Sequence, residues 1–404
     1  MQLAKLGDHA LRIIITRSLR GFADGGVSVL LATHLTALGF NAVEVGALVT
    51  GTLLGSAALT LTVGLWGNRF SHRGILLGSA LLMFATGLGF FGIHSFGPLL
   101  LVAAAGTLNP SAGDVSVFLP TEQAVLSDAA AGDRIAAFAR YNVCGNLAGA
   151  LGALTSGLPG QLAMRWGAER QSATRWGFLV YAAIAVLVAL LYRGLPQREP
   201  PHALAKTTAL ATSRRVVLKL AALFSLDSFA GGFAVQSLLA LWLFKRFGLS
   251  IGQVGGVFFA SGVLAAFSQL LSGRLAARIG LIETMVFTHL PANALLIGAA
   301  FMPNAHWAVA LLLMRMSLAQ MDVPARQAYV MGVVPPEERA AAASVTNVPR
   351  SLAAAITPFL AGLLLARSSF GWPLVFAGAL KIAYDLLLLA LFRSTRPLDE
   401  LARR

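Results

Sequence analysis

Long apolar segments separated by short polar connections recur along the whole chain. Most of these segments have about 20 residues, the length that an α-helix needs to cross the hydrocarbon core of a bilayer. Runs this long favour membrane-spanning helices over helices of a water-soluble core. The pattern predicts an all-α membrane protein with twelve transmembrane helices, at residues 12–38, 43–66, 75–95, 98–123, 136–158, 175–193, 216–244, 250–273, 281–302, 306–331, 342–366 and 373–392.

The chain also repeats itself. Residues 39–47, Gly-Phe-Asn-Ala-Val-Glu-Val-Gly-Ala, correspond to residues 248–256, Gly-Leu-Ser-Ile-Gly-Gln-Val-Gly-Gly, at a shift of 209 positions. The same shift carries residues 64–71 onto residues 273–280. Because both halves run in the same order, we expect parallel repeats related by an axis along the membrane normal. The expected divisions are an N-terminal six-helix bundle, a cytoplasmic linker and a C-terminal six-helix bundle, at residues 1–193, 194–215 and 216–404.

Composition agrees with a membrane protein. Hydrophobic residues make up 57% of the chain and charged residues 12%, and the mean hydropathy is +0.74. Soluble domains carry about 25% charged residues. The net charge of +14 comes mostly from Lys and Arg in alternate connections. The positive-inside rule therefore places those connections and both termini in the cytoplasm. The basic excess is explained by topology and by the lipid bilayer, so no nucleic-acid partner is expected.

The sequence carries no motif of several other function classes. It has no Walker loop, metal-binding helix motif or nucleophile elbow, so we expect neither an enzyme nor a cofactor or metal site. The single cysteine, Cys144, allows no intrachain disulfide. The first residues are not expected to be a cleavable signal peptide, because charged side chains interrupt the apolar run at Arg12, Arg17, Arg20 and Asp24.

The connection between the second and third predicted helices carries a short motif of small and basic residues. It consists of Gly64, Asn68, Arg69, Ser71, His72 and Arg73, with a weaker second copy at Gly273, Ala277, Arg278 and Gly280. With these motifs the chain resembles the Major Facilitator Superfamily, whose signature here is Gly-x-x-x-Asp-Arg-x-Gly followed by two basic residues. Asn68 and Ala277 replace the aspartate, and Ser71 replaces a glycine.

The resemblance implies two six-helix bundles that rock against each other to give alternating access. In this family the first, fourth, seventh and tenth helices line a central cavity, and the loop motif takes part in conformational gating. It further implies a small-molecule substrate, protons as the expected coupling ion, a monomer, and a location in the plasma membrane (the bacterial inner membrane). The resemblance does not fix the direction of transport, because the family's antiporter motif on the fifth helix is only partly kept. Gly145 and Gly149 match this motif, but Ala150 stands where proline is expected. Close helix packing is the other interpretation of these glycines.

Ionisable residues fall within several predicted membrane helices, where they usually face a cavity or a partner. Three couples of opposite charge are spaced four residues apart, which puts both members on one helix face. Each couple could neutralise itself without a further role. The couples are Arg20 with Asp24, Asp322 with Arg326, and Lys381 with Asp385.

The repeat suggests a different pairing. Arg20 corresponds to Asp227 at a shift of 207, and Glu122 corresponds to Arg326 at a shift of 204. Equivalent positions of the two halves thus carry opposite charges, and the resemblance puts them on opposing cavity walls. We hypothesise that Arg20–Asp227 and Glu122–Arg326 are gating ion pairs, since buried pairs serve better as switches than as a source of stability.

A proton-coupled transporter needs a carboxylate that gains and loses a proton as its surroundings change. The candidates are Asp24, Glu122 and Asp227. Asp24 precedes Gly25 and Gly26, two glycines that we expect to bring the backbone close to the cavity.

Further polar residues are candidates for lining the substrate cavity: Asp114, Gln123, Gln236, Asp322 and Gln327. Asp114 lies in the polar run 109–114, which could form part of the site or only a local kink. We expect His34 and His289 to form ordinary interhelical hydrogen bonds. Three arginines could bind an anionic substrate, pair with a carboxylate or extend toward headgroups: Arg140, Arg315 and Arg350.

The interpretation that these features favour is a secondary active transporter, with proton-coupled efflux of a small organic solute as the first choice. Uptake or export of a specific small anion or metabolite is the alternative, because arginines accompany the buried acids. A non-transporting membrane sensor is disfavoured, because it would not need titratable groups in a cavity. A passive channel is disfavoured as well, since no repeated polar ring is evident.

Overall fold

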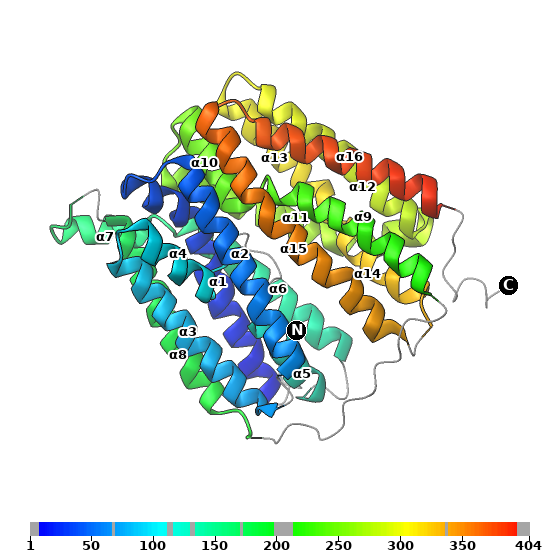
Figure 1. Cartoon of the computed structure of the whole chain (residues 1–404), viewed down its shortest axis with the longest axis horizontal. Helices are drawn as coiled ribbons and strands as arrows, with labels where there is room; N and C mark the ends of the chain where they lie inside the picture. The colour runs from blue at the N-terminus through cyan, green and yellow to red at the C-terminus, as the bar shows by residue number, and fades with distance from the viewer. Residues whose placement is uncertain are drawn as a thin grey trace. The chain divides into compact units, whose positions relative to one another are not determined.

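The computed structural model describes residues 8–66, 69–110, 116–129, 134–169, 173–197, 213–335 and 338–393 of the 404-residue chain. This part of the chain is helical and contains no β-strand, which confirms the predicted all-α class (Figure 1). The helices of the first half are α1 (Asp8–Ala37), α2 (Ala42–Trp66), α3 (His72–Gly92), α4 (Phe96–Ala105), α5 (Phe118–Ala129), α6 (Arg134–Leu154), α7 (Leu158–Arg165), the 3-10 turn η2 (Ala173–Arg175) and α8 (Trp176–Arg193). Those of the second half are α9 (Arg214–Gly232), α10 (Gln236–Phe247), α11 (Ile251–Ile279), α12 (Leu281–Phe301), α13 (Ala305–Ala319), α14 (Asp322–Gly332), α15 (Arg339–Arg367) and α16 (Trp372–Phe392).

Helices lie in each of the twelve ranges expected from the sequence. Nine helical stretches of the described chain are long and apolar enough to cross a membrane, by length and composition. The count of twelve spans stays a prediction. Nine stretches are enough to make this a multi-pass membrane protein.

Three of the expected helices are interrupted. The fourth stops at Ala105 and resumes at Phe118, so the polar run that begins at Asn109 follows a helix end. The seventh is divided between α9 and α10, and the tenth between α13 and α14. Interrupted helices leave backbone groups without intrahelical partners, and in membranes this is tolerated where protein or water can satisfy them.

Contacts divide the chain into two units. The first contains residues 1–203, 236–244 and 248–262, and the second contains 204–235, 245–247 and 263–404. Most of α10 and the first part of α11 thus belong to the first unit, where the Ser237 amide donates a hydrogen bond of 3.1 Å to the Pro110 carbonyl. The bundle boundaries at the linker stay a prediction.

Within the first unit, α1 packs against α6 through glycines. A Cβ atom on Gly25 would lie 1.9 Å from the Gly149 carbonyl oxygen, and one on Gly152 would lie 1.9 Å from the Phe22 carbonyl oxygen. Such distances admit no side chain, so the two backbones touch. The packing interpretation of Gly149 is therefore confirmed. Gly25 and Gly26 both face α6, which is a different role from the predicted exposure of backbone to a cavity.

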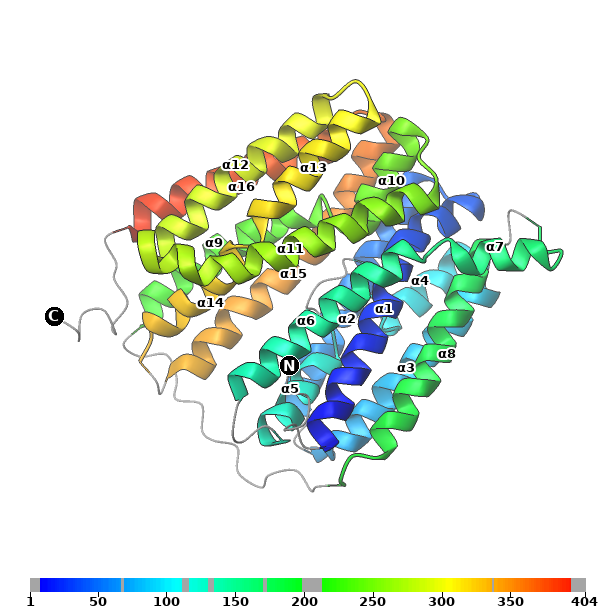
Figure 2. The same ribbon diagram turned by 180° about the vertical axis from the view of Figure 1, so that it is seen from behind.

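The second unit has a matching helix contact between α9 and α15, where a Cβ atom on Gly232 would lie 2.5 Å from the Ala354 carbonyl oxygen. Both ribbon views also show α12 beside α16 in this unit, and α3 beside α8 in the first (Figures 1 and 2). The core of the second unit is apolar and aromatic, and it includes Phe224, Tyr329 and Tyr384.

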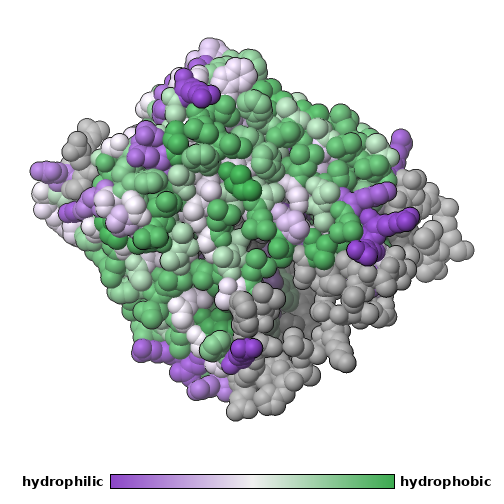
Figure 3. Space-filling model, viewed as in Figure 1, coloured by the Kyte–Doolittle hydropathy of each residue, from purple (hydrophilic) through white to green (hydrophobic). Residues whose placement is uncertain are grey.

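One face of the molecule is largely apolar in its described part. The face in Figure 3 is covered mainly by hydrophobic residues, while hydrophilic residues gather toward its margins. Large side chains are exposed on several helices, among them Leu81, Leu101 and Leu270. A soluble monomer rarely exposes apolar patches of this extent, so the surface suits contact with lipid.

Candidate functional site

A buried carboxylate, Glu122, organises the polar residues of the first unit. Its side chain is fully buried on α5. It forms an ion pair with Arg20 of α1 and accepts a hydrogen bond of 3.1 Å from the Thr16 hydroxyl. The Tyr141 and Tyr192 hydroxyls donate to it over 2.6 and 2.5 Å. Four donors from α1, α6 and α8 therefore hold one carboxylate, which links these helices to α5.

Arg20 is held on its other sides as well. Its guanidinium lies 4.2 Å from the centroid of the Phe118 ring, in a cation–π contact, and donates to the Ser116 hydroxyl over 3.4 Å. The group is 1% exposed. Because burying an ion pair costs desolvation energy, this pair is by itself weak evidence for added stability.

Asp24 lies one helical turn beyond Arg20 but is not its ion-pair partner, because the Arg20 guanidinium turns to Glu122. Among the residues that the structure describes, Asp24 has no hydrogen bond or ion pair, although it is only 7% exposed. Arg20 and Asp24 therefore form no ion pair with each other in this structure, although their charges interact. Asp24 is a buried carboxylate of α1 that lacks the ion pair and hydrogen bonds of Glu122, although the charges of Arg20 and Arg17 act on it.

The second unit has its own buried carboxylate, Asp227 of α9. Lys381 of α16 donates to it over 2.5 Å, and Arg326 of α14 donates over 3.2 Å. Arg326 also lies 3.5 Å from Asp322, so the predicted couple of these two is confirmed. The couple is incomplete by itself, however, because Asp227 shares the same guanidinium.

Asp385 and Lys381 do not form the predicted couple. Lys381 pairs with Asp227, while Asp385 accepts from Asn293 over 3.1 Å and lies 2.9 Å from Nδ1 of His289. The prediction failed because spacing brings two side chains to one face but does not say which neighbouring helix offers the better partner. His289 makes the interhelical contact expected of it.

His34 also meets its expectation. Its ring nitrogens lie 3.3 Å from the Thr174 hydroxyl and 3.1 Å from the Phe90 carbonyl oxygen. Among the residues described, no group of three or more His, Cys, Asp or Glu side chains could hold a metal ion.

The structure thus brings Arg20 to Glu122 and Arg326 to Asp227, each pair inside one unit. Pairing of Arg20 with Asp227 and of Glu122 with Arg326 stays a prediction. The remaining cavity candidates are scattered, with Gln123 and Gln236 half-buried and Gln327 exposed. Of the loop motif, Arg69 and Arg278 are exposed, Arg73 is half-buried and Gly64 lies in α2. Asp114 and Asn68 lie outside the described residues.

The sequence alone did not identify several residues of these two clusters. Tyr141 and Tyr192 supply half of the donors to Glu122, yet tyrosine in an apolar helix gives no sign of which residue its hydroxyl will reach. The sequence indicated Lys381 and Asp385 only as a possible ion pair with each other. A signal for their true partners existed in Asp227 and His289, which are ionisable residues in the interior of neighbouring apolar helices.

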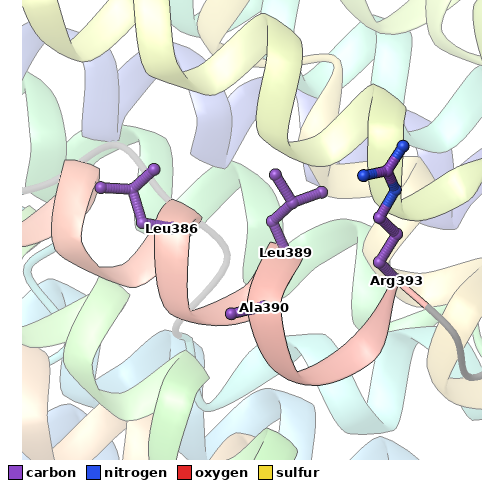
Figure 4. Close-up of a pocket in the computed structure, with 4 residues that line it drawn as sticks. All are labelled: Leu386, Leu389, Ala390 and Arg393. Carbon is purple, nitrogen blue, oxygen red and sulfur yellow. The ribbon is translucent and has the colours of Figure 1, made fainter.

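A groove of about 590 Å³ lies along the end of α16, where Leu386, Leu389, Ala390 and Arg393 line it (Figure 4). Leu386, Leu389 and Arg393 extend from the same side of the helix in this view. The groove contains none of the buried carboxylates described above, so its chemistry differs from that of the two charged clusters.

Comparison with known proteins gives one consistent result. The sequence model of the Major Facilitator Superfamily matches residues 13–348. An uncharacterized membrane protein of Saccharomyces cerevisiae, YJR124C, is 23% identical over 412 residues, which cover 93% of this chain and 92% of that protein. An uncharacterized MFS-type transporter of Bacillus subtilis, YceJ, is 24% identical over 198 residues, covering 46% of this chain and 49% of the relative.

Solved structures of transporters share the fold. A bacterial homolog of the human lysosomal transporter Spinster, in an inward-facing and occupied conformation, has a TM-score of 0.74 at 16% identity, covering 96% of this chain and 97% of its own. The xylose transporter XylE of E. coli has a TM-score of 0.71 at 16% identity, covering 98% and 99%. With the family match spanning most of its length, the chain belongs to the Major Facilitator Superfamily and is a transporter of that type.

Proposed function

We propose that this transporter moves a small organic solute by alternating access and couples that movement to protons. The observation that carries the proposal is Asp24, a 7% exposed carboxylate without a hydrogen bond or ion pair among the described residues. An ionised carboxylate held this way in a membrane is costly unless it is neutralised. Binding a proton neutralises it, and release of that proton needs a change of surroundings, which alternating access provides.

The other two candidates for proton coupling differ from Asp24 in their contacts. Glu122 and Asp227 already face cations and several donors. They would exchange a proton only after leaving these partners. We therefore assign the primary coupling role to Asp24 and a positioning role to Glu122 and Asp227.

Efflux is the direction that we propose first, because the helices are rich in phenylalanine, leucine and alanine, which suits a poorly hydrated organic solute. Transport of a specific small anion or metabolite, inward or outward, is the second candidate. It is favoured by the arginines at membrane depth, Arg315 and Arg350. In either case we propose a monomer in the plasma membrane with cytoplasmic termini.

The test is transport into proteoliposomes with an imposed pH gradient, using labelled anions, sugars and lipophilic cations. We expect a pH gradient to drive accumulation of at least one solute by the wild type. Asp24→Asn should abolish the dependence on the gradient while retaining exchange of solute between the two sides, because exchange needs no net proton movement. Glu44→Gln is the matched control. The Glu44 carboxylate accepts a hydrogen bond from the Asn41 backbone N–H at the start of α2, and glutamine keeps an acceptor there.

Two results would contradict the proposal. Transport that ignores the pH gradient for every solute would remove proton coupling from the protein. Accumulation by Asp24→Asn that responds to the gradient as the wild type does would remove Asp24 from the coupling step, whatever the solute.

A further inference from the structure

Two arginines of the second unit form no ion pair with a carboxylate among the described residues. Arg315 lies on α13, and its only hydrogen-bond acceptor among the described residues is the Met316 sulfur, at 3.3 Å from its NH1 atom. Its Nε atom is buried and has no hydrogen-bond partner. A thioether is a weak acceptor and carries no charge. The guanidinium of Arg315 is therefore unneutralised within the described chain.

Arg350 of α15 is in a similar position. Its Nε donates to the Ser228 hydroxyl over 3.0 Å, and its NH1 donates to the Asn347 side-chain oxygen over 3.2 Å. Both acceptors are neutral. They orient the guanidinium but do not compensate its charge.

The carboxylates nearby are already engaged. Asp227 pairs with Lys381 and Arg326, and Asp322 pairs with Arg326. Arg315 and Arg350 both interact electrostatically with these two carboxylates, at distances beyond an ion pair. The two arginines therefore border one cluster, which contains more cations than it can neutralise.

Extension toward lipid headgroups does not account for Arg315. It is ten residues from the Ala305 end of α13. At a rise of about 1.5 Å per residue this is ~15 Å along the helix, farther than an arginine side chain reaches. On its other side α14 follows almost at once, with Asp322 seven residues on and Arg326 eleven.

We propose that Arg315 and Arg350 bind an anionic group of the transported solute, a carboxylate or a phosphate. The inference rests on the proposed transport function and favours its second candidate, a solute that carries an anionic group. Guanidinium groups match planar anions with two parallel hydrogen bonds, which makes arginine suited to this recognition. The anion supplies a counter-charge that the described part of the chain does not provide to these two cations.

This arrangement predicts opposite effects on stability and on binding. Removing a half-buried charge that has no carboxylate partner among the described residues should raise the thermal stability of the solute-free protein, because its desolvation cost disappears. The same change should weaken anion binding. A residue with only a structural role would lose stability when replaced, so the two roles are separated by the sign of the effect.

The experiment measures thermal unfolding of the purified full-length protein against increasing lactate, succinate and inorganic phosphate, with xylose and tetraphenylphosphonium as neutral and cationic comparisons. We expect at least one anion to raise the melting temperature in a saturable manner. Arg315→Gln and Arg350→Gln should each weaken that anion about tenfold or more, equivalent to ~1.4 kcal/mol. Both variants should also melt at or above the wild-type temperature without solute.

Two further variants serve as controls. Arg315→Lys keeps the charge but loses the planar fork, so it should fold and bind with intermediate affinity. Arg393→Gln makes the same exchange at an exposed arginine at the end of α16 and should leave the response unchanged. The inference is overturned when no anion raises the melting temperature, when only xylose or the cation does, or when the Gln variants respond as the wild type does.

An anionic lipid has the same chemistry as a phosphate-bearing solute. Repeating the measurement in phosphatidylcholine nanodiscs with and without phosphatidylglycerol separates the two sources. Stabilisation by phosphatidylglycerol that disappears in Arg315→Gln would assign the arginines to lipid and overturn the substrate assignment. Anion binding without any pH-gradient dependence of transport would instead leave this inference standing and contradict only proton coupling.

Discussion

Buried hydroxyl groups in this protein differ sharply in what they contact. Tyr192 donates to the fully buried Glu122 over 2.5 Å, whereas the hydroxyl of Tyr384 is buried and has no hydrogen-bond partner among the described residues. Hydrogen bonds to charged groups contribute about 1.5–3 kcal/mol. An unsatisfied buried hydroxyl contributes nothing and carries a desolvation cost. The same side chain is thus favourable at one position and unfavourable at the other.

At the scale of single residues, the same Tyr→Phe substitution at these two positions should have different effects. Tyr192→Phe should destabilise the protein by about 1.5–3 kcal/mol, because Glu122 loses one of four donors. Tyr384→Phe, the matched control, should be neutral or stabilising. Thermal or denaturant unfolding in one detergent measures both. Equal losses in the two variants would show that the hydrogen bond to Glu122 does not set the effect.

Sequence reasoning reached the ionisable residues of both clusters but assigned only some of their partners. Asp322 and Arg326 pair as their spacing predicted, and His289 is satisfied as expected. Lys381 and Asp385 have the same spacing and yet contact other helices. Spacing fixes which residues share a face, but the choice between a neighbour on that face and one on the next helix depends on packing that no local pattern records.

Helix contacts in the first unit depend on where a side chain is absent. Gly25 and Gly152 place α1 and α6 in backbone contact, while Gly78 of α3 has nothing within 4 Å of an added Cβ. The helices were predictable from long apolar runs. The interruptions between α9 and α10 and between α13 and α14 were not, because short breaks within apolar runs leave the hydrophobic pattern unchanged.

These glycines yield the prediction at the scale of elements. Gly25→Ala should strongly lower stability and transport, because its methyl group would meet the Gly149 carbonyl oxygen and force α1 away from α6. Gly78→Ala should be neutral or stabilise by up to about 1 kcal/mol, since alanine favours a helix where there is room. Melting temperature and yield of folded protein measure both. A tolerated Gly25→Ala would mean that α1 and α6 do not pack this closely in the membrane.

At the scale of the whole molecule, the charges of the two halves are related by the repeat but are neutralised separately. Arg20 pairs with Glu122 in the first unit, and Asp227 pairs with Lys381 and Arg326 in the second. This changes how the predicted gating pair of Arg20 and Asp227 can be tested. Reversing both charges would place an acid against Glu122 and a base against Lys381, so loss of function would say nothing about pairing between halves.

Neutralising both residues avoids this difficulty. Arg20→Gln and Asp227→Asn each leave buried charges uncompensated within their own unit, so we expect their costs in unfolding free energy to add in the double variant. If the two residues meet during the transport cycle, their costs in transport rate should not add, with a coupling of at least about 0.5 kcal/mol. The control cycle combines Arg20→Gln with Asp385→Asn, which the repeat does not relate, and should be additive in both measurements. If the transport costs of Arg20 and Asp227 are additive, as in the control cycle, the two residues do not interact during transport. Each ion-pair cluster would then have only a structural role in its own half.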